Sequence, residues 1–94
     1  MNDEFFQALA SPYRREIIRL LKQKSLNAGE IASHFTISKP SVSRHLEVLR
    51  QAELVTVERR GTQLIYSVNL TVLQEMGMEL IELVSTKERV SNEP

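Results

Sequence analysis

Apolar residues recur at intervals of three and four in five stretches of the chain, and they change to a strand-like pattern between the fourth and the fifth. The helical stretches cover residues 4–11, 12–24, 28–35, 39–51 and 69–84. Residues 54–68 are rich in β-branched side chains on both sides of Gly61, which predicts a β-hairpin. The predicted fold class is therefore mainly α with a β-hairpin, in the order α-α-α-α-β-β-α.

Residues suited to helix capping stand at the starts of four of these stretches. Ser11, Asn27 and Ser38 are good N-caps for the second, third and fourth helices. The order Thr71-x-x-Gln74 resembles a capping box for the last helix. These residues support the helix starts that the apolar pattern predicts.

The third and fourth predicted helices have the pattern of a helix–turn–helix unit. Ala32 is small enough for two helices to cross closely, Ile37 fills the turn, and Val42 packs the second helix onto the first. Such a unit leaves the first turns of its second helix projecting, at a width that suits the major groove of DNA. The alternative is a plain helical hairpin within a core, but the β-hairpin that follows favours a winged helix–turn–helix.

The fourth helix has a clear inward face and a clear outward face. Val42, Leu46 and Leu49 recur at helical spacing and predict the buried side, so Arg44 lies on the opposite side. A guanidinium can bond O6 and N7 of guanine together, which makes Arg44 the candidate base reader. The alternative for Arg44 is an ordinary solvated arginine.

The residues around Arg44 supply further candidate DNA contacts. Lys39 suits a phosphate contact, which carries no sequence information. His45 lies beside the buried stripe, where a hydrogen bond at the edge of the core competes with a DNA contact. The predicted DNA-binding residues of this helix are Ser38, Lys39, Pro40, Ser41, Ser43, Arg44 and His45.

The tip of the predicted hairpin is basic. Arg59 and Arg60 precede Gly61, which permits the chain reversal, and a charged loop tip is the simple interpretation. Beside a helix–turn–helix, such a tip favours a wing that contacts the DNA backbone or minor groove. The predicted wing residues are Arg59, Arg60, Thr62 and Gln63. Arg14 and Arg15 of the second helix are candidates for additional phosphate contacts.

The last predicted helix is apolar around about half of its circumference, which is wider than the stripe of roughly 100° that one core requires. A small protein offers little surface to bury such a helix, so we expect a dimer interface, with the first helix completing it. A helix buried only in its own domain is the alternative. The predicted interface residues are Phe5, Phe6, Leu9, Leu73, Met76, Gly77, Leu80, Ile81 and Val84.

Composition limits the remaining possibilities. Ninety-four residues predict one domain over residues 1–94, with a polar, frayed tail over 85–94. The chain has no cysteine, so disulfides and thiolate metal sites are excluded. Its apolar runs are too short to span a membrane and no signal peptide precedes the first helix, so we expect a cytoplasmic protein without membrane insertion.

The net charge of zero does not exclude a nucleic-acid partner, because the charges are unevenly distributed. Residues 39–63 contain five basic and three acidic side chains, whereas residues 64–94 contain two basic and five acidic ones. The predicted recognition segment and wing can therefore present a basic surface. No nucleophile elbow, glycine-rich phosphate loop or metal-ligand spacing occurs, so we expect no enzyme, no metal and no cofactor.

Three segments of the sequence together resemble the ArsR-type winged helix–turn–helix repressors: ALASPYRREIIRLL, AGEIASHFTISKPSVSRHLEVLRQAELV and ERRGTQLIYSV. The similarity runs from about residue 4 to residue 84. It implies a homodimeric transcriptional repressor in which the first and last helices form the dimer and the fourth enters the major groove of a pseudo-palindromic operator. By motif position, residues 38–45 match the family's DNA-contacting segment and residues 59–63 its wing.

The departures from the family pattern concern the signal. Metal-sensing and persulfide-sensing members use cysteines that this chain lacks, and others use histidine and carboxylate pairs on the last helix, which has no histidine here. The chain is most similar to the metal-independent branch typified by SdpR-like autorepressors. The resemblance implies double-stranded operator DNA, a second copy of the chain and a regulatory partner protein as partners.

Two other functions stay open at the level of sequence. One is a winged-helix protein-interaction module without specific DNA binding, which the acidic Glu47 on the exposed face would suit. The other is a repressor that responds to a small molecule held between subunits by the apolar last helix. Binding to upstream DNA no tighter than to random duplex would favour the first, and ligand-dependent loss of binding the second.

Overall fold

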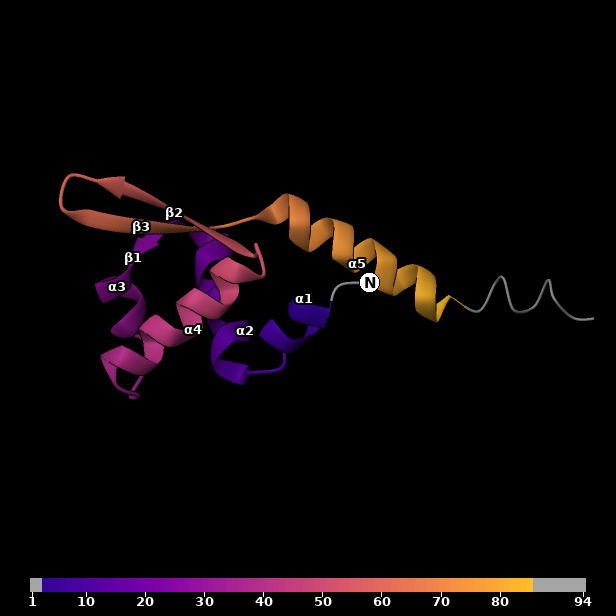
Figure 1. Cartoon of the computed structure of the whole chain (residues 1–94), viewed down its shortest axis with the longest axis horizontal. Helices are drawn as coiled ribbons and strands as arrows, with labels where there is room; N and C mark the ends of the chain where they lie inside the picture. The colour runs from indigo at the N-terminus through magenta and orange to yellow at the C-terminus, as the bar shows by residue number, and fades with distance from the viewer. Residues whose placement is uncertain (1–2, 86–94) are drawn as a thin grey trace, which may run out of the picture.

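The computed structural model describes residues 3–85, and within that range it contains five helices and a small antiparallel sheet (Figure 1). The elements are α1 (Asp3–Ala8), α2 (Pro12–Gln23), β1 (Leu26–Asn27), α3 (Ala28–Ala32), α4 (Lys39–Gln51), β2 (Val55–Arg60), β3 (Gln63–Val68) and α5 (Leu70–Val84). The predicted fold class, mainly α with a β-hairpin in a winged helix–turn–helix arrangement, is confirmed. The predicted tail lies outside the described residues apart from Ser85.

The capping residues of α2 and α4 act as predicted. The Ser11 side chain accepts a hydrogen bond from the backbone N–H of Arg14 at 3.4 Å, and the Ser38 side chain accepts one from the N–H of Ser41 at 3.3 Å. Each bond satisfies a donor that the helix itself leaves free. The helices α2 and α4 therefore have defined starts.

The helix α3 is shorter than the sequence pattern predicts. It begins with a capping box, in which Asn27 and Glu30 bond each other's backbone N–H groups at 2.7 and 2.8 Å. It ends at Ala32 rather than at Phe35, because His34 and Phe35 bond carbonyls only three residues back and form turns. The turn of the helix–turn–helix unit is correspondingly longer.

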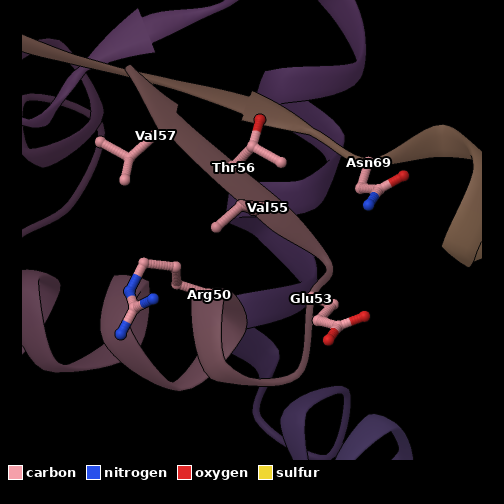
Figure 2. A pocket seen from close by; sticks show the side chains of 6 residues that line it. All are labelled: Arg50, Glu53, Val55, Thr56, Val57 and Asn69. Carbon is pink, nitrogen blue, oxygen red and sulfur yellow. The ribbon is translucent and has the colours of Figure 1, made fainter. Parts of the chain in front are cut away.

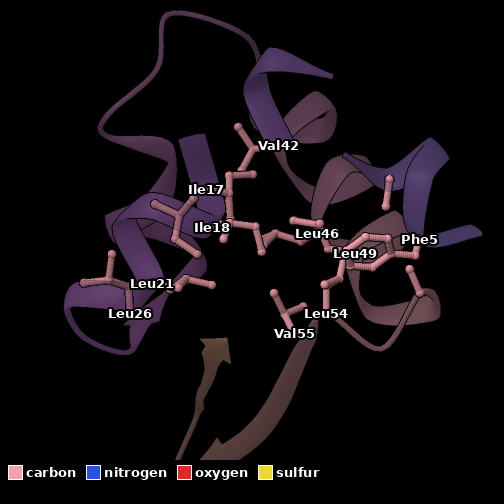
Figure 3. Packing of buried hydrophobic residues seen from close by; sticks show 13 residues of the cluster. Phe5, Ile17, Ile18, Leu21, Leu26, Val42, Leu46, Leu49, Leu54 and Val55 are labelled. Carbon is pink, nitrogen blue, oxygen red and sulfur yellow. The ribbon is translucent and has the colours of Figure 1, made fainter. Parts of the chain in front are cut away.

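One apolar core joins α1, α2, α3, α4 and the start of β2 (Figure 3). Ile17, Ile31 and Leu49 have no exposed surface, and full burial of such a side chain stabilises the fold by about 1.5–3 kcal/mol. The core consists of Phe5, Ala8, Ile17, Ile18, Leu21, Leu26, Ile31, Val42, Leu46, Leu49, Ala52, Leu54 and Val55. This packing fixes α4 against α2 and so fixes which side of α4 faces outward.

The sheet has the order β1-β3-β2 and is antiparallel throughout. β2 and β3 pair from Val55 opposite Val68 to Arg60 opposite Gln63, which leaves a two-residue loop at 61–62. Gly61 has φ of +63°, a conformation that side chains other than glycine adopt at a cost. β1 was not predicted; it is only two residues long, too short to show a strand pattern.

The chain turns sharply between α4 and β2. The N–H of Leu54 bonds the carbonyl oxygen of Leu49, and the N–H of Glu53 bonds that of Arg50, both at 2.9 Å. These two bonds form a Schellman motif, which places Glu53 in the left-handed region with φ of 64°. Leu54 and Val55 follow directly into the core, so the turn sets the position of the hairpin relative to α4.

The last helix leaves the body of the molecule and projects to the right in Figure 1. Its N-cap is Asn69, whose side chain accepts from the N–H of Val72 at 3.3 Å, so the predicted capping box at Thr71 is wrong. Val72, Leu73 and Met76 pack against the core, but no residue of α5 is fully buried. Between residues 3 and 85, no helix has the length and hydrophobicity needed to cross a membrane.

Candidate nucleic-acid interface

One face of α4 packs into the core, and the opposite face is exposed to solvent at the start of the helix. Val42, Leu46 and Leu49 are buried, as the sequence predicts, and they carry the helix against α2. Lys39, at the first position of α4, is exposed. The side chain of Arg44, in the second turn of the helix, is exposed and has no carboxylate partner in the part of the chain that the structure describes.

The serines at this end of α4 differ in what they can still bond. Ser38 donates its hydroxyl hydrogen to the Ser41 hydroxyl at 3.0 Å, so the Ser41 O–H remains available to an outside acceptor. Ser43 is exposed and lies on the α3 side of the helix, where it lines a small hollow with Lys39. Pro40 is exposed as well, and it contributes shape rather than a donor.

His45 lies at the edge of the helix interface rather than on the outward face. Its Nδ1 is 3.0 Å from Nη1 of Arg14, and its ring stacks on Tyr13 with centroids 5.4 Å apart. Arg14 also donates to the carbonyl oxygens of Gln7 and Ala8 at 3.1 and 2.7 Å. The Arg14 guanidinium is therefore bound inside the protein rather than free for the predicted phosphate contact, and Arg15 likewise donates to the Leu9 carbonyl at 2.7 Å.

In the second half of α4, an acidic side chain is paired with a basic one of the same helix. Arg50 donates two hydrogen bonds to the Glu47 carboxylate, at 3.0 and 2.6 Å, and Gln51 donates a third at 3.2 Å. The hydrogen bonds from Arg50 hold the pKa of the Glu47 carboxyl below its usual range. Glu47 is thus paired within the helix, and the first turns keep the unpaired positive charges of Lys39 and Arg44.

The hairpin tip is basic, and its two arginines point to opposite faces because side chains alternate along a strand. Arg59 pairs with Leu64 and lies on the same strand face as Val55 and Tyr66, which belong to the core or pack against it. Arg60 lies on the other face, and its Nη2 is 3.2 Å from the Glu58 carboxylate. All four predicted wing residues are exposed, and of the two arginines only Arg59 lacks an acidic partner within residues 3–85.

The two basic features lie at one end of the molecule. In Figure 1 the hairpin tip and the start of α4 are both at the left end of the long axis, and α5 extends to the right. The body of the protein lies between this basic end and α5. The arrangement separates a basic end from an apolar helix.

The predicted interface residues divide into three groups. Phe5 is a core residue with only 4% of its surface exposed in the protomer, so any part it takes in an interface is small. Phe6, Leu9, Leu73 and Met76 are partly buried against the core. The members of the predicted set with the most exposed apolar side chains are Leu80, Ile81 and Val84, in the second half of α5. Met78 and Leu83 of the same helix are exposed as well, but they were not among the predicted interface residues.

The surface beside Gly77 is also open. A Cβ atom placed on Gly77 would meet no atom within 4 Å, so the packing of this chain does not require glycine there. The position leaves room for close approach of another helix.

A hollow of about 390 Å³ lies between the end of α4 and β2 (Figure 2). The charged groups at its rim, Arg50 and Glu53, point away from each other, and Arg50 is already paired with Glu47. The hollow therefore offers no set of converging polar groups. Among the described residues, no three His, Cys, Asp or Glu side chains come together in a group that could hold a metal ion.

Comparison with known proteins agrees with this arrangement. The sequence model for "bacterial regulatory protein, arsR family" matches residues 11–57, which run from the cap of α2 into β2. The chain is 51% identical to "Transcriptional repressor SdpR" of Bacillus subtilis over 70 residues, which cover 74% of this chain and 78% of that protein.

Solved structures show the same fold. The crystal structure of an ArsR family transcriptional regulator, RHA00566, superposes with a TM-score of 0.82 at 22% identity, covering 98% of this chain and 92% of that one. The crystal structure of Rv0081 of Mycobacterium tuberculosis matches with a TM-score of 0.69 at 32% identity, covering 94% and 91%. From the family match and the close relative, the chain belongs to the ArsR family of bacterial regulatory proteins.

Proposed function

We propose that this protein is a homodimeric, sequence-specific DNA-binding transcriptional repressor. The observation that carries the proposal is the start of α4, where Lys39 and Arg44 project from a firmly packed helix and have no acidic partner among the described residues. Clustered cations without partners are what binding to DNA phosphates requires. Family membership and the similarity to a protein named a transcriptional repressor support the same function.

The start of α4 would enter the major groove, as in other helix–turn–helix proteins. Arg44 would read a guanine through two hydrogen bonds, while Lys39 would contact a phosphate and fix the register. The free hydroxyl hydrogen of Ser41 adds a short-range donor beside them. The chain would repress by occupying promoter DNA, so the function requires no catalysis.

The wing would contact DNA mainly through Arg59. Arg59 is free of acidic partners in the described part of the chain, whereas Arg60 shares its charge with Glu58. A phosphate contact from Arg59 should therefore release more counterions than one from Arg60. Thr62 and Gln63 at the loop are exposed and can bond the sugar–phosphate backbone.

A second copy of the chain would cover the second half of α5. Leu80, Ile81 and Val84 form a continuous exposed apolar surface that a soluble monomer has little reason to keep. Symmetric pairing would set two copies of α4 about 34–36 Å apart, one turn of DNA, and so select a pseudo-palindromic operator.

Selection from a random pool of duplex DNA tests this function directly. We expect the selected sequences to contain an inverted repeat, and the protein to bind it at least about a thousandfold more tightly than scrambled duplex at physiological salt. Arg59→Ala should lower the slope of log affinity against log salt by about 1.8, since a dimer loses two contacts, and Arg60→Ala should lower it less. Recovery of no preferred sequence would contradict the proposal and favour a protein-interaction module.

A further inference from the structure

Arg14 occupies a position that joins three helices. It lies in the first turn of α2, and its Nε and Nη2 donate to the carbonyls of Ala8 and Gln7 at the end of α1. The last turn of a helix leaves carbonyl oxygens without intrahelical donors, and Arg14 supplies a donor to both, although the Gln7 oxygen also accepts from the N–H of Ala10 at 3.1 Å. The remaining nitrogen, Nη1, lies 3.0 Å from Nδ1 of His45 on α4. One guanidinium therefore ties the end of α1 to the recognition helix.

The chemistry of this contact fixes the proton on His45. A guanidinium has only donors and stays protonated in proteins, so Arg14 must donate and Nδ1 of His45 must accept. The single proton of the neutral imidazole is then on Nε2. If the ring took up a second proton, Nδ1–H would face the N–H of Arg14, and the hydrogen bond would be lost.

The surroundings of the ring hold it in this form. Tyr13 of α2 stacks on it with the planes 30° apart, and the edge of Tyr13 in turn meets Phe35 with centroids at 5.8 Å. The charged and titratable groups that face the ring are Arg14 and Tyr13 of α2 and Arg44 of α4 itself. Burial, and then the positive charges of Arg14 and Arg44, lower the pKa of His45 below 6.5 and favour the neutral ring.

The second nitrogen of His45 is open to the outside. Nε2 has no hydrogen-bond partner among the described residues. Every fully buried side-chain nitrogen or oxygen in that part of the chain does have one. Nε2–H therefore reaches solvent, on the same helix as Arg44 and one residue after it.

We propose that Arg14 is a positioning residue for DNA recognition, which holds His45 as the Nε2–H tautomer so that this N–H donates to the operator beside Arg44. The inference rests on the proposed function, and it adds a residue that does not itself touch DNA. Because the same guanidinium binds the end of α1, it also couples α1 to the orientation of α4.

The tautomer is tested on the DNA-free protein by nitrogen–proton correlation spectra of the imidazole ring. We expect wild-type His45 to show the Nε2–H pattern at neutral pH, and Arg14→Gln to mix the two tautomers. Arg15→Gln is the matched control, because the Arg15 side chain donates to the Leu9 carbonyl and, among the described residues, has no hydrogen bond to His45, so the His45 pattern should stay unchanged. A wild-type ring protonated on Nδ1, or a pattern unaffected by Arg14→Gln, would overturn the inference.

The DNA part of the inference is tested with the selected operator. Arg14→Gln should weaken binding by about tenfold, because each half-site loses one well-oriented hydrogen bond, with the salt slope unchanged. A phosphate contact would instead reduce the slope by about 1.8 for the dimer, and that result would contradict a positioning role. Circular dichroism of each variant checks that the fold is intact.

Two substitutions of His45 separate its two nitrogens. The Asn oxygen can replace Nδ1 as the acceptor for Arg14 but leaves no outward donor, whereas the Gln amide can replace Nε2–H. His45→Gln should therefore bind the operator more tightly than His45→Asn, and the reverse order would overturn the inference. A wild-type protein that binds no DNA would overturn the proposed function as well, while normal operator binding by Arg14→Gln would overturn this inference alone.

Discussion

Removing apolar surface from the second half of α5 should separate the dimer without unfolding the protomer. Leu80 and Val84 are 43% and 63% exposed and lie one helical turn apart on the proposed interface. At about 0.8 kcal/mol per buried methylene, Leu80→Ala loses about 1 kcal/mol of burial across its exposed fraction, and Val84→Ala loses a similar amount. Both together remove about 2 kcal/mol per protomer, or about 4 kcal/mol per dimer, which weakens association by nearly three orders of magnitude.

Met78→Ala is the matched control, because Met78 is 65% exposed on the same helix but lies about 120° around it from Val84. Sedimentation equilibrium over a range of concentrations measures the dissociation constant of each protein. We expect the control to change it by less than about twofold, since exposed substitutions outside an interface are nearly neutral. Equal shifts for the control and the double variant, or a wild-type chain that is monomeric at micromolar concentration, would refute the proposed interface.

Three further predictions concern the fold. Leu49→Ala should cost about 2–5 kcal/mol in the free energy of unfolding measured by urea, because Leu49 is fully buried, and a cost as small as that of Leu83→Ala would contradict the core described here. Glu53→Gly should raise the free energy of unfolding by about 0.5–1 kcal/mol, because glycine adopts the positive φ of this position without strain, whereas Gln51→Gly within α4 should lower it. A lower free energy of unfolding for Glu53→Gly would show that the backbone at Glu53 is not strained. Because the pKa of His45 is lowered in the folded protein, its contribution to the free energy of unfolding should be fully present above pH 6.5 and should decrease as the pH falls further. If His45→Gln showed the same decrease in the free energy of unfolding with falling pH, His45 would not be the cause.

The sequence predicted the parts of the fold that depend on local spacing. Val42 and Leu46 identified the buried face of α4, and the β-branched run around Gly61 identified the hairpin. These features repeat over several residues, so periodicity detects them. The N-cap of α5 was misplaced because Thr71 fits the capping-box spacing as well as Asn69 fits a simple cap, and only the backbone distinguishes the two.

The contacts that orient the candidate site were beyond sequence reasoning. Arg14 and His45 are 31 residues apart, and no local pattern indicates that their side chains meet. Tyr13 gave no signal either, since one aromatic residue at a helix start is compatible with many roles. The pairing of Glu47 with Arg50 at three-residue spacing, in contrast, could have been predicted from helix geometry.

Base reading by Arg44 is tested most directly by the ratio of specific to non-specific DNA binding. Fluorescence anisotropy would give the affinity of each protein for the selected operator and for scrambled duplex at the same salt concentration. We expect Arg44→Ala to lose about 1–3 kcal/mol at each of the two half-sites of the operator and much less on scrambled DNA, so that the ratio falls by about 30-fold or more. Arg19→Ala, which removes an exposed arginine paired with Glu16 on α2, should keep the ratio. A ratio that Arg44→Ala leaves at the wild-type value would contradict base reading by Arg44.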